Sequence, residues 1–221
     1  MTRLINPKFS IVIPHYDQSI RDDFFIRGIK SLLDQEFQDF EVLLYHDGPI
    51  SRPIPDIYKE LGDRCRLTIT KKRKNDWGHS NRDDGIKNSN GDYIIHFNPD
   101  NVLYPFALKN LYELSIKPEA PGPAYTKRKS DILVFPIRMI GVECDGKFHW
   151  RTFDPKSAIV ITGYPAIPQY LDAMQVVMSY ATWHKIGYWY DKSKNSDGHI
   201  YSKAIREYGA RYTHSILGEH W

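Results

Sequence analysis

The sequence predicts an α/β fold in which a mostly parallel central sheet is flanked by helices. Residues 9–14 form a near-continuous apolar run, as expected of a parallel strand that is buried on both faces. Apolar residues at helical spacing follow at Phe25, Ile29, Leu32 and Leu33. Strands and helices then alternate through the first half of the chain, which is the pattern of βαβ units.

Boundary signals place the elements of the first half. Ser19 precedes Asp22 and Asp23, an arrangement that puts acids in the first turn of a helix. A polar helix at residues 79–90 ends at Gly91, its expected cap. The expected strands cover residues 9–14, 41–45, 66–70 and 93–97, and a further helix follows Pro105.

The second half mixes strands, loops and helices without the regular alternation. Its expected elements are a strand-like segment at 132–142, a hairpin turn at 144–147, a proline-rich loop at 164–170, a strand at 174–178, and helices at 180–186 and 197–208. We therefore expect one domain with a smaller mixed lobe that shapes a second pocket.

Composition excludes several classes of protein. The 221 residues carry 30 basic and 27 acidic side chains, a net charge of +3 that is too balanced for a nucleic-acid scaffold. The two cysteines, Cys65 and Cys144, form no CxxC pair, so we expect neither a zinc site built on cysteines nor a disulfide framework. No apolar run has the length of a membrane span, and the start of the chain lacks a signal-peptide core. A reducing, cytoplasmic location fits best.

The most informative segment lies just after the expected strand at 93–97. Asn98, Asp100 and Asn101 follow it at once, and ligands of open α/β sheets bind outside the carboxyl ends of the strands. Carboxylate and amide oxygens suit Mg²⁺ or Mn²⁺ better than zinc. A plain turn rich in Asn, Asp and Pro is the alternative, and the segment alone does not separate the two.

Four segments, taken in order, resemble the GT-A-fold glycosyltransferases of family 2, a large inverting group. They are Pro14-His15-Tyr16-Asp17, His46-Asp47-Gly48, Arg82-Asp83-Asp84-Gly85-Ile86 leading into Gly91-Asp92-Tyr93-Ile94, and Asn98-Pro99-Asp100-Asn101. The last corresponds to the metal motif of the family. The resemblance is strong over the first half and weak over the second. His15 replaces a small hydroxyl residue, Asp83 an Asn, and Asn98 the first acid of the metal motif.

The resemblance implies that the first half binds a nucleoside diphosphate sugar, most simply a UDP-sugar. The residues it assigns to the donor are Pro14, His15, Tyr16, Asp47, Arg82, Asn98 and Asp100. Tyr16 would stack on the base, and Asp47 would accept a hydrogen bond from uracil. Arg82 would add charge near the nucleotide, and Asn98 would bond a ribose hydroxyl. The competing interpretations are strand-end packing for Tyr16, turn stabilisation for Asp47 and a solvent-facing helix position for Arg82.

The resemblance also implies a divalent cation, Mn²⁺ or Mg²⁺, that neutralises the leaving diphosphate. Asp100 is the first expected ligand, and His220 matches the late histidine that the family often supplies. Asp197 is the expected general base, with Asp191 as the second candidate. A helix cap or first-turn acid is the alternative for Asp197.

Aromatic side chains of the second half are candidate platforms for a sugar ring, with core packing as the alternative. They are Trp150, Trp183, Trp189 and Tyr190.

The resemblance thus implies an inverting, metal-assisted transfer of a sugar from a UDP-sugar to a hydroxyl of a glycan or glycoconjugate. It divides the single domain 1–221 into a nucleotide-sugar-binding half, 1–103, and an acceptor-side half, 104–221. One alternative is a sugar nucleotidyltransferase, although residues 15–18 lack the Gly-rich basic loop that this class needs. The other is a catalytically silent binding module, which the neutral Asn98 keeps open. The ending at Trp221 is compatible with a piece of a longer protein, and the sequence does not set the oligomeric state.

Overall fold

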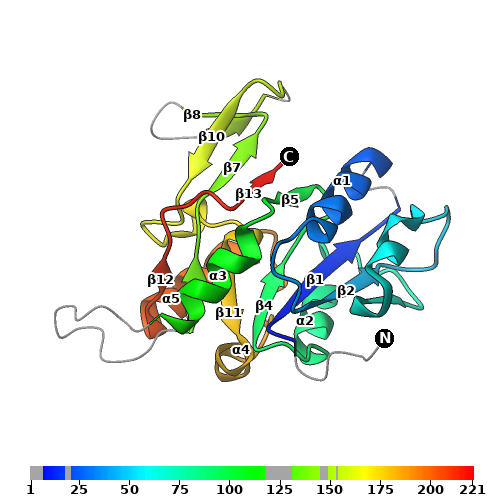
Figure 1. The fold of residues 1–221 in the computed structure, drawn as a ribbon, viewed down its shortest axis with the longest axis horizontal. Helices are drawn as coiled ribbons and strands as arrows, with labels where there is room; N and C mark the ends of the chain where they lie inside the picture. Colours follow the sequence, from blue (N-terminus) through cyan, green and yellow to red (C-terminus); the bar gives the residue numbers. More distant parts are fainter. Residues whose placement is uncertain (1–6, 18–20, 118–130, 145–148, 153) are drawn as a thin grey trace.

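The computed structural model describes residues 7–17, 21–117, 131–144, 149–152 and 154–221. Its centre is a seven-stranded sheet in the order β12-β6-β11-β4-β1-β2-β3 (Figure 1). The strands are β1 (Phe9–His15), β2 (Phe40–His46), β3 (Cys65–Ile69), β4 (Tyr93–His96), β6 (Ile132–Val134), β11 (Val176–Ser179) and β12 (Arg211–Tyr212). Neighbouring strands pair in parallel except on both sides of β11. This confirms the predicted α/β class with a mostly parallel sheet.

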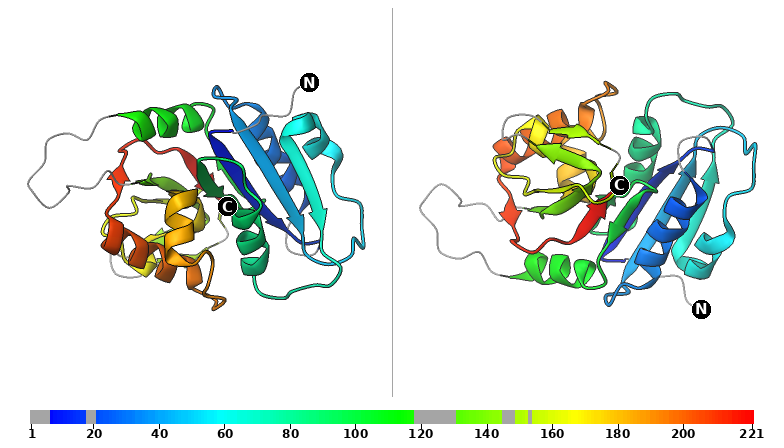
Figure 2. Two further views of the ribbon diagram at one scale, coloured as in Figure 1. Left: turned by 90° about the horizontal axis from the view of Figure 1, so that it is seen from below. Right: turned by 90° about the horizontal axis from the view of Figure 1, so that it is seen from above.

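Helices cover both faces of the sheet, which explains the uninterrupted apolar run of β1. Side chains of α1 (Asp22–Leu33) and α3 (Ala107–Ile116) join the core on the Ile11 and Ile13 face. The opposite face, on the Val12 side, packs against α2 (His79–Lys87), α4 (Tyr180–Ile186) and α5 (Ser196–Tyr208) (Figure 2). Parallel strands covered on both sides need apolar residues at every position.

A four-stranded sheet in the order β10-β7-β13-β5 forms much of the second lobe. Its strands are β5 (Asn101–Leu103), β7 (Ile137–Ile140), β10 (Ala158–Ile161) and β13 (Gly218–His220). The pairing of β13 with β5 sets His220 opposite Asn101, so the end of the chain returns to the segment that follows β4. This return positions one of the candidate metal ligands.

Several predicted elements have different boundaries in the structure. The strand-like segment 132–142 is three strands, β6, β7 and β8 (Val142–Cys144), which lie in three different sheets. Pro136, which cannot donate to a sheet ladder, separates the first two, and Gly141, at φ 70°, separates the others. β8 pairs antiparallel with β9 (His149–Arg151), while the predicted turn between them falls largely outside the described residues.

The remaining differences concern helical turns. Helix α2 ends at Lys87, three residues before the predicted end at 90. The predicted strand 174–178 begins with a 3-10 turn, η3 (Ala173–Gln175), before β11. Two further 3-10 segments are η1 (Asp56–Arg64) and η2 (Pro168–Tyr170).

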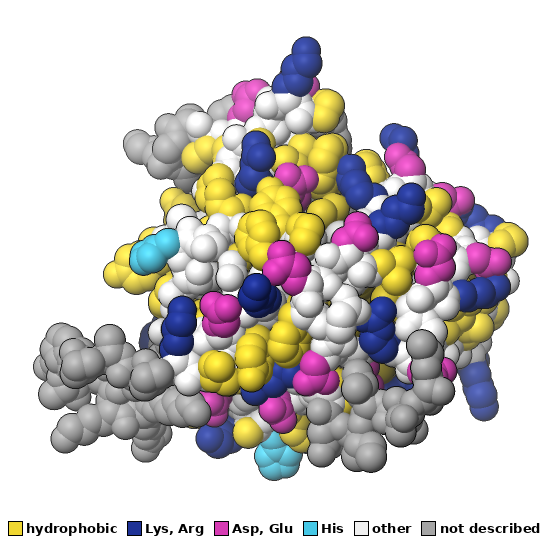
Figure 3. All heavy atoms as spheres, in the orientation of Figure 1, with side chains coloured by type: hydrophobic (Ala, Val, Ile, Leu, Met, Phe, Trp, Pro, Cys, Tyr) yellow, Lys and Arg dark blue, Asp and Glu magenta, His cyan; other side chains and the backbone are white. Residues whose placement is uncertain are grey.

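The molecular surface agrees with the nearly balanced charge. On the face drawn in Figure 3, acidic and basic side chains are interspersed, without a field of one sign. Among the described residues, none of the helices has the length and apolar character needed to cross a membrane.

Candidate active site

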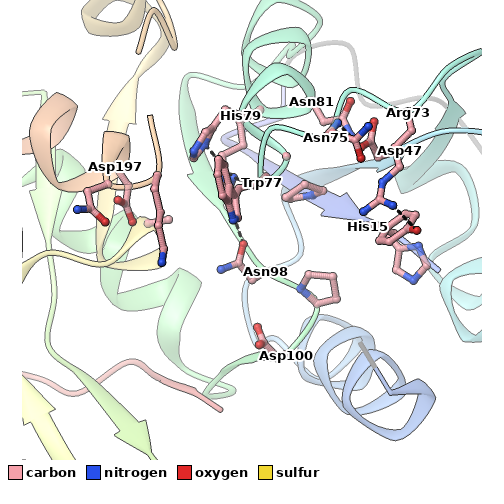
Figure 4. A pocket seen from close by; sticks show the side chains of 18 residues that line it. His15, Asp47, Arg73, Asn75, Trp77, His79, Asn81, Asn98, Asp100 and Asp197 are labelled. Carbon is pink, nitrogen blue, oxygen red and sulfur yellow. Dashed lines mark hydrogen bonds between the residues drawn. The ribbon is translucent and has the colours of Figure 1, made fainter. Parts of the chain in front are cut away.

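A cavity of about 550 Å³ opens at the carboxyl ends of β1, β2 and β4 (Figure 4). These strands are parallel, so the loops that follow them meet at one edge of the sheet. The cavity is lined by eight of the ten residues expected from the sequence to form the site. They are Pro14, His15, Tyr16, Asp47, Arg82, Asn98, Asp100 and Asp197.

At one end of the cavity, Asp47 organises the loop that precedes α2. Its carboxylate accepts hydrogen bonds from the backbone N–H groups of Lys74, at 2.9 Å, and Asn75, at 3.4 Å. Arg73 of the same loop lies over the Tyr16 ring, with its guanidinium carbon 3.3 Å from the ring centroid, and donates to the Tyr16 hydroxyl. Tyr16, predicted from the resemblance as a stacking surface, therefore carries a cation on its ring in this structure.

Arg82 extends from α2 into the floor of the cavity and is only 6% exposed. Its guanidinium donates to the side-chain oxygen of Asn98 at 2.6 Å and to the backbone carbonyl of Trp77 at 2.8 Å. Burial lowers the pKa of Arg82, but a guanidinium stays charged in proteins. The interpretation of Arg82 as a solvent-facing helix residue is therefore wrong, because α2 turns this side chain toward the strand ends.

Asp100 and His220 lie close together, because Asp100 directly precedes β5 and His220 is the last residue of the neighbouring strand β13. The Oδ2 atom of Asp100 lies 3.9 Å from Nε2 of His220, and Nδ1 of His220 lies 2.8 Å from Oδ2 of Asp172. Oδ1 of Asp100 is buried and has no hydrogen-bond partner among the described residues. Burial raises the pKa of Asp100. Burial lowers the pKa of His220, but the charge of Asp172, its hydrogen bond to His220 and the charge of Asp100 together outweigh burial, and the net shift is upward.

The structure separates the two candidate bases. Asp197 lies in the first turn of α5 and lines the cavity, where burial and then the charge of Asp172 raise its pKa. Asp191 does not line the cavity. Its carboxylate accepts from the backbone N–H of Ser193 at 2.8 Å and lies 3.7 Å from Nδ1 of His199, and the bond from Ser193 lowers its pKa.

The sequence of this chain is similar to those of known proteins. Residues 10–172 match the family model described as Glycosyl transferase family 2. The chain belongs to this family. It is 32% identical over 114 residues to an uncharacterized glycosyltransferase of Rickettsia bellii, a match that covers 52% of this chain and 15% of the relative. A relative in Rickettsia conorii is also 32% identical, over 117 residues, with 17% of its length covered. The chain thus spans a small part of the curated relatives it matches.

Solved structures share the fold of this family 2 chain. S. aureus TarS superposes with a TM-score of 0.68 at 12% identity, covering 96% of this chain and 36% of TarS. TarS 1–349 in complex with UDP-GlcNAc gives 0.63 at 15% identity, covering 96% of this chain and 58% of that one. The mannosyltransferase PcManGT of Pyrobaculum calidifontis, in complex with GDP-Man and Mn²⁺, superposes with a TM-score of 0.66 at 10% identity. The match covers 97% of this chain and 57% of PcManGT. These neighbours confirm the GT-A fold expected from the sequence.

Two residues at the candidate site, Asp172 and Trp77, were not expected from the sequence. Asp172 lies 72 positions from Asp100 along the chain, and only folding brings it behind His220. Its one local signal is a capping box with Gln175 at η3. Trp77, 65% exposed and at φ 54°, stands on the rim of the cavity beside His79.

The aromatic platforms expected in the second half have other positions. Trp183 and Trp189 are fully buried in the core beside α5, so their interpretation as sugar-stacking surfaces is wrong. The reason is that α4 and the loop after it close one face of the sheet. Tyr190 is 47% exposed, and the side chain of Trp150 lies outside the described residues.

Proposed function

We propose that this family 2 chain is an inverting, metal-assisted glycosyltransferase that moves a sugar from a UDP-sugar to a hydroxyl of a glycan or glycoconjugate. One observation carries the proposal. A buried cation, Arg82, and two half-buried carboxylates, Asp100 and Asp197, line the same cavity at the ends of the parallel strands. In TarS and PcManGT, which share the fold, the bound molecules are UDP-GlcNAc and GDP-Man with Mn²⁺.

The donor nucleotide would bind at the end of the cavity formed by Tyr16, Asp47 and Arg73. Asp47 holds the loop of Arg73 in place, and the Tyr16–Arg73 pair offers a flat, positively charged surface to a base. Arg82 would face the diphosphate. Its positive charge is not neutralised, because its partner Asn98 is a neutral amide. In this proposal residues 1–103 supply most of the donor site, and residues 104–221 supply the acceptor side.

The residues around Asp100 fit a divalent cation. Asp100 offers a buried oxygen without a partner, and Asp172 holds His220 by Nδ1, which leaves Nε2 3.9 Å from Asp100 and 3.3 Å from the guanidinium of Arg151. When bound, such a cation neutralises the charge that develops on the leaving diphosphate. Asp100 and His220 would hold it.

Asp197 would take the proton from the acceptor hydroxyl. Burial and then the charge of Asp172 raise the pKa of Asp197, which makes its carboxylate a stronger base than that of an exposed aspartate. Its backbone contact is with Gly198 N–H, at 2.8 Å, so the carboxylate is oriented by its own helix.

The test is UDP release from a panel of UDP-sugars with Mn²⁺, with and without glycan acceptors. Asp197→Asn should lower turnover by about 10²–10⁴-fold while donor affinity changes little. Asp191→Asn, outside the cavity, should leave turnover close to wild type. Full activity of Asp197→Asn, or loss of activity only in Asp191→Asn, would contradict the assignment. Donor binding without turnover on any acceptor would instead support a silent binding module.

A further inference from the structure

A second cluster of potential ligands lies beside the cavity, at the ends of β1 and β2. It consists of His15, Asp17 and His46, which are 4%, 4% and 0% exposed. His15 and His46 are register partners on the two parallel strands, and Asp17 follows two residues after His15. One ligand atom from each residue lies within 4.8 Å of the other two. Within the part of the chain that the structure describes, no other three His, Cys, Asp or Glu residues meet this criterion.

His46 faces oxygen on both sides of its ring. Nδ1 lies 2.8 Å from the backbone carbonyl of Gly48, and Nε2 lies 2.6 Å from Oδ1 of Asp17. The carbonyl only accepts, so Nδ1 carries the hydrogen and donates it. A neutral imidazole then presents a lone pair at Nε2, directed at a carboxylate. That contact needs a positive species between the two atoms, either a proton or a metal ion.

His15 favours the metal ion. Its Nδ1 atom is buried and has no hydrogen-bond partner among the described residues, and its ring centroid lies 5.2 Å from that of His46. A proton on His46 would leave this buried nitrogen without a partner, which is unfavourable for a polar group. A metal ion bound by both imidazoles and by Asp17 would replace the proton between His46 and Asp17 and would also give His15 a partner.

The surroundings of the cluster resemble the supporting shell of a metal site. Gly48 fixes the orientation of His46, and the backbone N–H and hydroxyl of Ser51 donate to Oδ2 of Asp17. Ligating histidines commonly donate their other N–H to a carbonyl, and ligating carboxylates are themselves hydrogen-bonded.

We propose that His15, Asp17 and His46 form a second metal site, which binds a transition-metal ion of the Zn²⁺ class separately from the cation of the diphosphate site. Two imidazoles and one carboxylate suit Zn²⁺ or Co²⁺, whereas sets made mostly of oxygen ligands suit Mg²⁺ and Mn²⁺. Bonds of about 2.1 Å in a tetrahedral site place ligand atoms about 3.4 Å apart, so the close His46–Asp17 pair opens by less than about 1 Å. A bound ion would tie together the ends of β1 and β2, which carry Tyr16 and Asp47.

The experiment titrates metal-free protein with Co²⁺ in the presence of excess Mg²⁺ and follows the visible absorption of tetrahedral Co²⁺. Wild-type protein should bind one Co²⁺ per chain, displaceable by Zn²⁺. His46→Gln and Asp17→Asn should each weaken this binding about tenfold or more. His184→Gln, which removes an exposed histidine on α4, is the matched control and should bind as wild type does.

The Asp100→Ala variant separates this site from the proposed catalytic one. It should retain Co²⁺ binding even if it loses UDP binding, and Co²⁺ binding should persist if no UDP-sugar is ever turned over. If His46→Gln or Asp17→Asn does not fold, X-ray absorption spectroscopy of the wild-type Co²⁺ complex should show two imidazole ligands. A shell of oxygen ligands alone, no Co²⁺ retained, or equal affinity in the folded variants would overturn the proposal and leave an Asp17–His46 ion pair.

Discussion

At the scale of single residues, the candidate site is organised around the buried charge of Arg82. Asn98 stands where the resemblance leads one to expect an acid, and the structure shows this residue accepting from Arg82 at 2.6 Å. An aspartate there would form an ion pair with Arg82 and cancel much of its charge. The neutral amide accepts the hydrogen bond and leaves the positive charge available to an anionic ligand.

Asp172 offers a sharp test of the proposed cation. We predict that Asp172→Asn weakens Mn²⁺-dependent UDP binding by about 10–100-fold, because the amide no longer supports the charge and orientation of His220. Asparagine keeps an oxygen for the cap to Met174, so η3 should persist. Calorimetric titration with UDP, with and without Mn²⁺, measures the effect. An equal loss of affinity in both conditions would contradict it.

The lowered pKa of His79 predicts that the stability of the protein depends on pH. Burial and then the charge of Arg82 lower the pKa of His79 from 6.5 to about 4, and its ring stacks on Trp189. The unfolded chain therefore binds more protons than the folded protein between these two values. The contribution of neutral His79 to the stability of the fold is complete above pH 6.5 and is lost as the pH falls toward about 4.

We predict that the free energy of unfolding, measured by denaturant titration with EDTA present, falls with pH over this window. His79→Gln should make the dependence less steep, because the glutamine does not titrate, while His15, whose burial also lowers its pKa to about 4, keeps its share. His184→Gln, at an exposed position, should leave the slope unchanged. The same slope in His79→Gln as in wild type would show that His79 does not supply it.

At the scale of elements, the cavity depends on how closely α2 approaches β1. A Cβ atom at Gly85 would lie 2.3 Å from Cγ1 of Val12, a distance that packed atoms do not adopt. Glycine therefore allows the helix to lie close against the strand, which brings Arg82 over the strand ends. Any outward shift of α2 would move Arg82 away from Asn98.

We predict that Gly85→Ala destabilises the protein by about 1–3 kcal/mol, even though alanine favours helix formation. Denaturant titration measures this loss. Combining it with Val12→Ala should cost less than the sum of the two single changes, because the smaller side chain makes room for the new methyl group. Strict additivity would argue against the steric explanation.

At the scale of the whole molecule, the last strand joins the two lobes. β13 pairs with β5 on one side and β7 on the other, and Trp221 lies under Arg27 of α1, whose guanidinium carbon is 3.8 Å from the indole centroid. The Trp221 indole N–H donates to Glu219 at 2.9 Å, and Glu219 accepts from the Tyr104 hydroxyl at 2.9 Å. These contacts place His220 next to Asp100.

We predict that Trp221→Ala weakens the Mn²⁺-dependent part of UDP binding and lowers stability by about 1–2 kcal/mol, since the cation–π contact is lost. The metal-free affinity for UDP should stay close to wild type, because the base end of the cavity is distant along the sheet. Ile116→Ala, an exposed apolar residue at the end of α3, is the control. Unchanged Mn²⁺ dependence in Trp221→Ala would exclude this role for β13.

The amino-acid sequence was sufficient to predict the parallel strands and the residues that follow them. Both are local: an apolar run fixes a buried strand, and the residues after it lie at the sheet edge wherever the strand is placed. For this reason six of the expected residues, which lie at or just after strand ends, line one cavity: Pro14, His15, Tyr16, Asp47, Asn98 and Asp100.

Contacts between distant segments could be established only from the three-dimensional structure. It set Asp172 behind His220, turned Arg82 inward, buried Trp183 and Trp189, and paired His15 with His46. No local pattern encodes such contacts, because they depend on strand order and on which helix covers which face. The sequence therefore indicated which side chains could take part in the chemistry, whereas packing determined which residues they contact.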